Sequence, residues 1–414
     1  MAQLSDDCFA FGGQLLGIDE AAGLIATRVL PLPGREWVPL NATRGRVLVT
    51  PLLAPGPLPP FFNAAVDGYA FAHGSLGPGE TRLPLAGRAP AGVAAPPLAP
   101  GTAMRIFTGA PMPAGADTVM MQEDATLADG TLLLPEGLKQ GANCRPAGED
   151  VAAGAQALPA GTRLGPAEIG LAAALGVARL QCAPLLRVGV FSTGDELAEP
   201  GTALRHAQTF DSNRFTLLAL LAGLPVMGSD LGIRPDEPRA TAAALTAAAA
   251  HHDLLLTSGG VSAGEEDHVR AAIEGAGRLV FWRLAVKPGR PAAMGVIGGT
   301  PVLGLPGNPV AAVVCFLHLA RPLIQRLAGE APDPLPRFPA IAGFAHRKKA
   351  GRREYLRVRL VREGGKLRAD KFAREGAGLL TSLTQSDAFC ELVEDQRDIA
   401  PGDLVQVLPF AGMF

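Results

Sequence analysis

Short apolar runs alternate with helical segments between residues 185 and 330, and this rhythm constrains the fold more than any other feature of the chain. Strands that alternate with helices at this spacing form a parallel sheet with helices on both faces. We therefore expect a three-layer α/β domain over residues 185–330. The apolar runs are LLRVGVFS, PVMGSDLGI, DLLLTS, RLVFWRLAV and TPVLGL, and the helical segments include RFTLLALLAG, PRATAAALTAAAA and VRAAIEGAG.

The rest of the chain has a different pattern on each side of this region. Residues 55–141 are rich in proline, glycine and short alternating runs, which indicates a β-rich domain with frequent turns. The segments that flank it, 14–54 and 142–184, both contain helical spacing. After the linker APDPLPRFP, short alternating strands over residues 331–414 indicate a small C-terminal β domain.

Bulk composition argues against several classes of protein. The formal net charge of −2 is unsuited to a nucleic-acid or anionic-membrane partner held by bulk electrostatics. None of the five cysteines forms a CxxC pair, so neither a zinc ribbon nor a disulfide scaffold is indicated. The N-terminus does not resemble a signal peptide, and the apolar segment PVAAVVCFLHLARPLI is broken before about 18 residues. We expect a cytoplasmic protein in which that segment is a buried helix.

Four loops that follow the expected strands carry the distinctive residues of the chain. In an open α/β sheet, ligands bind beyond the carboxyl ends of the strands, in the loops that lead into helices. We therefore expect the four loops to lie along one edge of the sheet. They are TGDEL (193–197), SGGVSAGEED (258–267), KPGRP (287–291) and PGNPV (306–310).

These loops combine bare backbone amides with charges of both signs. Gly259 and Gly260 allow N–H groups to surround an anion at the start of a helix. Lys287 and Arg290 add full positive charge, whereas the carboxylates would repel a phosphate unless a cation lay between them. Because Mg²⁺ is the usual cation of such sites, we expect a metal-bridged phosphate ester or pyrophosphate. The carboxylates are Asp195, Glu196, Glu266 and Asp267.

Each loop alone also has an ordinary structural explanation. A glycine-rich turn can be a tight connection, acids in a first helical turn complement the helix dipole, and Asn308 can be an N-cap. Lys287 can be a solvated surface lysine. No GxGxxG follows a strand and no GxxxxGK[ST] occurs, and His251 and His252 would splay apart on a helix. The combination of four loops is what favours a ligand site.

The ordered set of segments resembles the molybdopterin molybdenumtransferases of the MoeA type. The resemblance covers nearly the whole chain and is weaker in REYLR (353–357) and LLTSLTQSDAF (379–389). Each segment is weak by itself, but their order is specific. The matching segments are NAAVDGYA (63–70), RIFTGAPMPAGADTVMMQED (105–124), RPAGEDV (145–151), FSTGDEL (191–197), DSNR (211–214), TSGGVSAGEEDH (257–268), VKPGRP (286–291) and GLPGNPV (304–310).

The resemblance implies a multidomain fold and a reaction. The fold would have a molybdopterin-binding α/β domain, an elongated split helical segment (14–54 and 142–184), an inserted β-rich domain and a C-terminal β-barrel-like domain. The enzyme would insert molybdenum from molybdate into adenylylated molybdopterin, with Mg²⁺-assisted pyrophosphate cleavage and AMP release. It would act as a homodimer whose sites combine the α/β domain of one subunit with the β-rich domain of the other. Molybdopterin adenylyltransferase and apo-molybdoenzymes are the further partners implied.

The resemblance also assigns roles to individual residues. Glu196 and Asp267 would be metal-side or catalytic carboxylates, and Thr108 a catalytic residue from the partner side. Asp236 would contribute to the pterin side of the pocket. The implied substrate-binding residues are Thr193, Gly194, Asp195, Asp236, Ser258, Gly259, Gly260, Ser262, Gly264, Lys287, Arg290, Pro306, Gly307, Asn308 and Pro309, with Asp67, Glu149 and Asp150 from the partner side.

The sequence departs from the family pattern at a few positions. Phe62 stands where the family commonly has a carboxylate, and Ala64 stands where it has a hydroxyl. Ala311 replaces a usual serine, while Arg290 replaces a common lysine and keeps the charge. The change at Phe62 removes a partner-side ligand. Two alternatives therefore stay open: a divergent non-catalytic molybdopterin-binding or scaffold paralogue, and a molybdopterin adenylyltransferase that shares the α/β domain.

Overall fold

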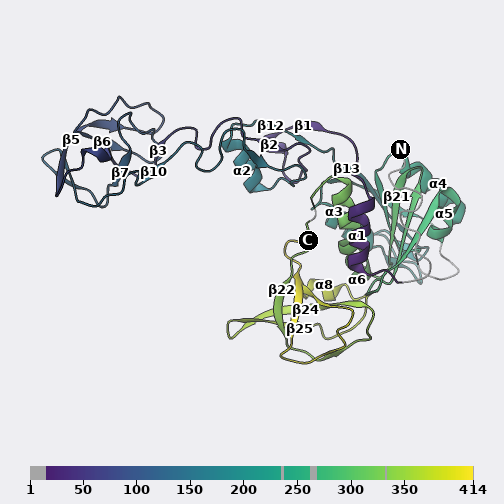
Figure 1. Ribbon diagram of the computed structural model, residues 1–414. Coiled ribbons are helices and arrows are strands. Elements are labelled where there is room, and N and C mark those ends of the chain that lie inside the picture. Colours follow the sequence, from purple (N-terminus) through teal and green to yellow (C-terminus); the bar gives the residue numbers. More distant parts are fainter. Residues whose placement is uncertain (1–14, 235–236, 262–267, 332, 414) are drawn as a thin grey trace.

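The computed structural model describes residues 15–234, 237–261, 268–331 and 333–413. Figure 1 shows an elongated molecule with four parts, which we name by their elements. The β lobe carries strands β3 to β10 at one end. The neck carries β1, β2, β11, β12 and helix α2. The body carries the α/β sheet, and the C-terminal lobe carries strands β22 to β28 beside the body.

The β lobe is a six-stranded sheet in the order β7-β4-β6-β5-β9-β8. Strands β4 and β7 are antiparallel, and a further antiparallel pair, β3 with β10, lies where the lobe joins the neck. Apolar side chains fill the sheet on both sides, among them Phe71 and Ile106. The strands are β3 (Asn63–Ala64), β4 (Gly68–Phe71), β5 (Thr81–Ala89), β6 (Ala103–Ile106), β7 (Thr118–Met121), β8 (Thr126–Ala128), β9 (Thr131–Leu134) and β10 (Cys144–Arg145).

The neck is held by strand pairs from two distant stretches of chain and by one helix. Strand β1 (Glu36–Pro39) pairs with β12 (Arg179–Cys182), and β2 (Leu52–Leu53) pairs with β11 (Gln156–Leu158). Helix α2 (Pro166–Ala174) begins with proline in its first turn, where a missing N–H costs nothing. The β lobe is therefore an insertion that leaves the neck and returns to it.

The body contains a six-stranded sheet in the order β16-β13-β17-β21-β20-β18. The first four strands are parallel, but β20 is antiparallel to both of its neighbours, so the expectation of a purely parallel sheet is wrong at this edge. A tight turn at Gly298 and Gly299, both with positive φ, joins β20 to β21 as a hairpin. The strands are β13 (Leu186–Thr193), β16 (Val226–Arg234), β17 (Leu254–Ser258), β18 (Arg278–Arg283), β20 (Pro291–Ile297) and β21 (Thr300–Leu305).

Helices cover both faces of this sheet, as expected for three layers. One face packs against α1, α3 and the segment α6–η3–α7, and the other packs against α4 and α5. The segment Pro309–Leu327 is apolar enough to span a bilayer by length and composition, but 83% of its window is buried inside the body. The helices are α1 (Ile18–Arg28), α3 (Asn213–Leu221), α4 (Pro238–Ala249), α5 (His268–Ala276), α6 (Pro309–Cys315), the π turn η3 (Phe316–Ala320) and α7 (Arg321–Leu327).

The C-terminal lobe is a closed five-stranded barrel. Its strands follow the order β24-β25-β22-β28-β26, and β26 pairs back with β24. Strand β19 (Val286–Lys287) leaves the body and adds to β24, so the KPGRP loop joins the two parts. The barrel-like expectation is confirmed. The strands are β22 (Phe338–Ala342), β24 (Arg353–Glu363), β25 (Lys366–Lys371), β26 (Ala388–Leu392) and β28 (Leu404–Pro409), with the short pair β23 (His346–Arg347) and β27 (Asp398–Ile399) and helix α8 (Thr381–Thr384) beside them.

Candidate functional site

The loops that follow β17 and β21 meet at one edge of the body's sheet. The backbone N–H of Gly259 donates to the carbonyl of Leu305 at 3.1 Å, which ties the SGG loop to the end of β21. A Cβ placed on Gly307 would lie 3.7 Å from the Cα of Gly259, so the two loops also touch at their glycines. The TGDEL loop joins them, because Thr193 lies against both Gly259 and Gly260.

Neither glycine of the SGG loop can be replaced without displacing backbone or buried atoms. Gly259 and Gly260 have φ values of +90° and +66°, which side-chain-bearing residues rarely adopt. A Cβ on Gly259 would lie 2.7 Å from the Thr193 carbonyl oxygen, and one on Gly260 would lie 2.5 Å from Val269. Glycine is therefore required at both positions, and neither residue has a side chain to cover the backbone of the loop. Such a loop allows an anion to approach the backbone.

The PGNPV loop presents backbone donors at the start of α6. Among the residues that the structure describes, no group accepts a hydrogen bond from the N–H of Gly307 or Asn308. Asn308 occupies the N-cap of α6, yet its side chain makes no capping bond, so the ordinary N-cap explanation does not apply. Arrayed N–H groups and the helix dipole together make this point suitable for an anion.

The carboxylate of Glu196 lies beside this edge, on the TGDEL loop. It folds back over Gly194, so that a Cβ there would lie 2.5 Å from Glu196 Oε2. Gly194 has φ +146° and is therefore strained for any other residue as well. Asp195 and Glu196 are both exposed to solvent. An exposed carboxylate on this loop fits a cation shared between protein and phosphate oxygens.

The sequence predicts that Lys287 is available to a phosphate, but in the structure Lys287 forms an ion pair within the protein. Its Nζ lies 2.7 Å from Oε1 of Glu354, a buried carboxylate on β24 of the C-terminal lobe. The other oxygen of Glu354 lies 3.3 Å from Nε2 of His346. The Lys287 side chain is 56% exposed, so it can still reach a ligand while it is paired. Arg290, in the same loop, is exposed.

A cavity of about 210 Å³ next to Lys287 was missed by the sequence reasoning. It lies between the KPGRP loop and the C-terminal lobe, and the N–H of Val310 reaches the Ala377 carbonyl in its wall at 3.0 Å. Arg357, the last residue of REYLR, lines this cavity, but the sequence pattern does not show that REYLR lies beside the body. The charged lining residues are the cations Lys287, Arg357, Lys371 and Arg374 and the carboxylates Glu354 and Glu375.

Arg357 is the buried cation of this cavity. Its guanidinium donates to the Ser382 hydroxyl and to the Gly376 carbonyl, both at 3.0 Å, and no ion pair with it is described. Burial lowers the pKa of Arg357, although the nearby Glu375 and Glu354 raise it. A buried arginine without a paired carboxylate leaves positive charge available for a small oxyanion.

The β lobe carries a second set of site residues at a distance from these loops. The backbone N–H and the hydroxyl of Thr108 both donate to Oδ1 of Asp67, at 2.8 and 2.7 Å. These bonds favour the charged form and lower the pKa of Asp67. Figure 1 shows the β lobe at the opposite end of the neck from the body, so Asp67 and Thr108 do not meet the glycine loops of their own chain.

Glu149, Asp150 and Phe62 lie where the β lobe joins the neck. Glu149 and Asp150 are exposed on a turn, and the N–H of Asp150 donates to the Leu58 carbonyl at 2.9 Å. Phe62 is half-buried, and its carbonyl accepts from the N–H of Met112 at 3.0 Å. None of these three residues contacts the described part of the glycine loops of the body in the same chain.

Some expected site residues lie outside the described residues. They are Asp236, Ser262, Gly264, Glu266 and Asp267, so their roles stay predictions.

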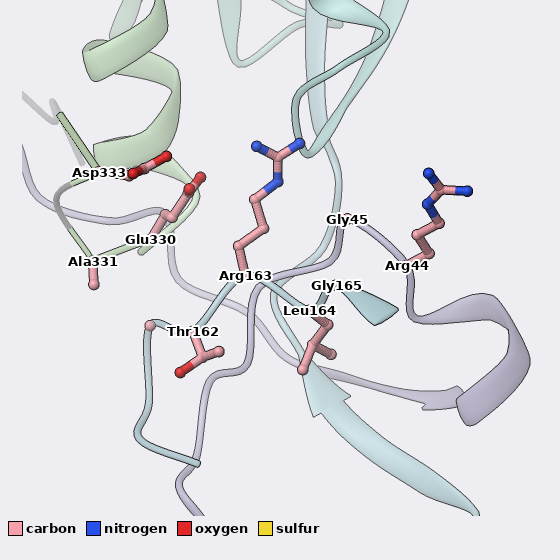
Figure 2. Close-up of a pocket in the computed structure, with 10 residues that line it drawn as sticks. Arg44, Gly45, Thr162, Arg163, Leu164, Gly165, Glu330, Ala331 and Asp333 are labelled. Carbon is pink, nitrogen blue, oxygen red and sulfur yellow. The ribbon is translucent and has the colours of Figure 1, made fainter. Parts of the chain in front are cut away.

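A separate hollow of about 480 Å³ lies between the neck and the end of α7 (Figure 2). Its lining includes Arg44, Arg163, Glu330 and Asp333 and none of the four loops. Glu330 is buried; its Oε1 accepts from Gln325 at 3.0 Å, and its Oε2 has no described partner. Burial raises the pKa of Glu330. Because the N–H of Ala331 donates to the Gly161 carbonyl at 2.9 Å, this contact joins neck and body.

Three family descriptions match successive parts of the chain. Residues 16–176 match the MoeA N-terminal region (domain I and II), residues 189–326 a probable molybdopterin binding domain, and residues 339–410 the MoeA C-terminal region (domain IV). The molybdopterin molybdenumtransferase of Haemophilus influenzae is 38% identical over 401 residues, which cover 96% of this chain and 99% of that protein. The chain belongs to the MoeA family. The resemblance recognised in the sequence and the expected transferase class are thereby confirmed.

Other MoeA relatives agree in extent and in fold. Molybdopterin molybdenumtransferase 2 of Mycobacterium tuberculosis is 36% identical and covers 89% of this chain and 94% of its own length. A MoeA structure from Pyrococcus horikoshii superimposes with a TM-score of 0.81 at 26% identity and covers 96% of this chain and 100% of its own. The chain contains the MoeA N-terminal and C-terminal regions in addition to the body. It is therefore not a molybdopterin adenylyltransferase, which would resemble it in the body alone.

Proposed function

We propose that this chain inserts molybdenum into adenylylated molybdopterin, with cleavage of the pyrophosphate bond and release of AMP. The observation that carries the proposal is the meeting of the SGG and PGNPV loops beside Glu196 and next to a cationic cavity. Relatives that match most of the chain are named molybdopterin molybdenumtransferases, which supports the proposal. These loops would hold the pyrophosphate through the N–H groups of Gly307 and Asn308, which have no acceptor among the described residues.

Mg²⁺ fits the residues present at this edge. It commonly binds through one or two carboxylates together with phosphate oxygens and water, and no all-protein cage is needed. Glu196 supplies an exposed carboxylate that lies against Gly194, and Asp267 is the second carboxylate we assign to it. A bound Mg²⁺ would offset the negative charge that develops on oxygen during cleavage. Glu196 then has the role of holding that cation at the pyrophosphate.

Molybdate is the second substrate, and we assign it to the cavity beside Lys287. Among the charged side chains in the lining, cations outnumber carboxylates by four to two. The guanidinium of Arg357 is in the lining and bonds to Ser382 and Gly376 through Nε and one terminal nitrogen, which leaves further N–H groups for an oxyanion, and Lys287 adds charge from the body. The cavity adjoins the PGNPV loop, so molybdate bound there would lie close to a substrate held by the glycine loops.

The active unit would be a homodimer in the cytoplasm. Asp67 and Thr108 form a hydrogen-bonded pair on a lobe that stands away from the loops of its own chain (Figure 1). A second copy is the simplest source of those residues at the site, as a symmetric pair of chains can exchange them. Molybdopterin adenylyltransferase would supply the substrate, and apo-molybdoenzymes would receive the product.

One experiment tests the reaction against a non-catalytic scaffold role, which Phe62 favours. The full chain is incubated with adenylylated molybdopterin, Mg²⁺ and molybdate, and AMP and active cofactor are measured. We expect both products to depend on molybdate and Mg²⁺. Tight binding of the substrate without AMP release would instead support the scaffold role.

A further inference from the structure

The start of helix α3 connects the loops of the candidate site, and the proposed reaction does not use it. Asn213 is buried, and its Nδ2 lies 2.7 Å from the Ser258 hydroxyl and 2.7 Å from the Gly307 carbonyl. Ser258 belongs to the SGG loop and Gly307 to the PGNPV loop. One side-chain amide therefore spans the two loops that we assign to the pyrophosphate.

The orientation of this amide follows from its partners. The Gly307 carbonyl can only accept, so the nitrogen of the Asn213 amide must face it. The second hydrogen of Nδ2 goes to Ser258, whose own hydroxyl points to the Pro306 carbonyl at 3.4 Å. Asn213 and Ser258 thus hold two consecutive carbonyls of the PGNPV loop, those of Pro306 and Gly307.

This arrangement determines where the backbone donors point. In a trans peptide the N–H points away from the C=O of the same unit. With the carbonyls of Pro306 and Gly307 turned toward Asn213 and Ser258, the N–H groups of Gly307 and Asn308 turn to the opposite side. These are the donors for which no acceptor is found among the described residues. The amide of Asn213 therefore directs them to the ligand.

Asn213 itself is held at a fixed place by its neighbour on α3. The buried guanidinium of Arg214 pairs with Asp211 at 3.0 Å and also with Asp230 and Glu199. Burial alone would lower the pKa of Arg214, but its hydrogen bonds with these carboxylates raise it, so the cation is retained. Glu199 follows the TGDEL loop, which ties α3 to that loop too.

We propose that Asn213 is a positioning residue that sets the PGNPV loop in the orientation needed to bind a pyrophosphate, through its two donated hydrogen bonds. The inference rests on the proposed function, because it assigns the pyrophosphate to these loops. It adds that affinity depends on a residue which does not itself touch the ligand. A displacement of about 1 Å at such a site typically costs on the order of 10²-fold in rate.

The test uses Mg²⁺ and ADP as a stable pyrophosphate probe, with full-length protein and calorimetric binding. The variants are Asn213→Ala, which removes both bonds, and Asn213→Asp, which has the same shape but cannot donate to the Gly307 carbonyl while ionised. Thr216→Ala is the matched control, because Thr216 lies on the same helix and its hydroxyl donates to the Ser212 carbonyl of that helix at 2.9 Å. Thermal unfolding of each variant is measured on the same samples.

We expect both Asn213 variants to bind ADP about 10- to 100-fold more weakly and to show a raised KM for adenylylated molybdopterin, while Thr216→Ala matches the parent. The affinity of Asn213→Asp, relative to the parent at each pH, should recover as the pH falls, since the protonated carboxyl can donate to Gly307. Unchanged ADP affinity in folded Asn213→Ala, or no recovery at low pH, would overturn the proposal. So would an absence of ADP binding by the parent, whereas ADP binding without AMP release from the substrate would refute only the proposed reaction.

Discussion

The carboxylate of Glu196 rests on the Cα of Gly194, with Oε2 only 2.5 Å from where a Cβ would be. Gly194→Ala should therefore displace the carboxylate and strain a backbone at φ +146°. If Glu196 holds Mg²⁺, the rate of AMP release should fall about 10²–10³-fold, with an increased requirement for Mg²⁺. A titration of activity against Mg²⁺ checks this. Gly201→Ala, at a positive-φ glycine with no atom near its missing Cβ, controls for backbone strain alone.

The pairing of Lys287 with Glu354 predicts the behaviour of the cationic cavity. Glu354→Gln removes one of two carboxylates from the cavity and releases Lys287 for an oxyanion. We expect molybdate to bind about tenfold more tightly at low ionic strength, which corresponds to roughly 1.4 kcal/mol. The gain should shrink in high salt because charge interactions are screened. Glu363→Gln, on the same strand but paired with Arg368 outside the cavity, should leave molybdate affinity unchanged. Equal affinities in all three proteins would place molybdate elsewhere.

Glu330 should make stability depend on pH at the contact of neck and body. Because burial raises its pKa, the folded chain binds the proton more tightly than the unfolded chain. At a pH above the ordinary glutamate pKa, Glu330 therefore lowers the free energy of unfolding, and below that pKa, where both states bind the proton, it has no such effect. Glu330→Gln should raise the melting temperature at pH 7–8, and the gain should vanish near pH 4. Asp333→Asn, at an exposed acid paired with Arg321, should not reproduce this profile. A gain independent of pH would contradict the role of burial.

Subunit complementation tests whether two chains share one site. Asp67→Ala removes the acceptor of both Thr108 bonds on the β lobe, and Glu196→Gln removes the carboxylate on the body. Each variant alone should have little activity. After the two are mixed and allowed to exchange subunits, about a quarter of the sites should regain both residues. Verified heterodimers that remain inactive would show that the two residues do not act together across subunits.

The sequence determines the local elements well and the long-range pairs poorly. The helical spacing in 14–54 and 142–184 predicts helices there, and the structure contains α1 and α2 in these segments. Strand β20 is not predicted, because PAAMGVI contains several small residues and follows a loop that the βα pattern predicts to lead into a helix. The Lys287–Glu354 pair and the cavity with Arg357 join segments far apart in the chain. No local pattern encodes that approach, so only the assembled barrel and body reveal it.

Phe62 provides the last prediction, since an aromatic ring cannot coordinate Mg²⁺ and cannot donate to molybdate. We expect Phe62→Asp, which restores the acid common in the family, to raise molybdenum insertion at low molybdate and to leave binding of adenylylated molybdopterin unchanged. Phe62 is half-buried beside Phe61, so removing the ring should also cost about 1–3 kcal/mol of stability. Phe61→Asp, at the more exposed neighbour, controls for added charge at this junction. Melting temperature and molybdate-dependent AMP release are measured on the same sample. Lower stability without a gain at low molybdate would mean that Phe62 serves packing at the junction and that the remaining carboxylates suffice for the metal.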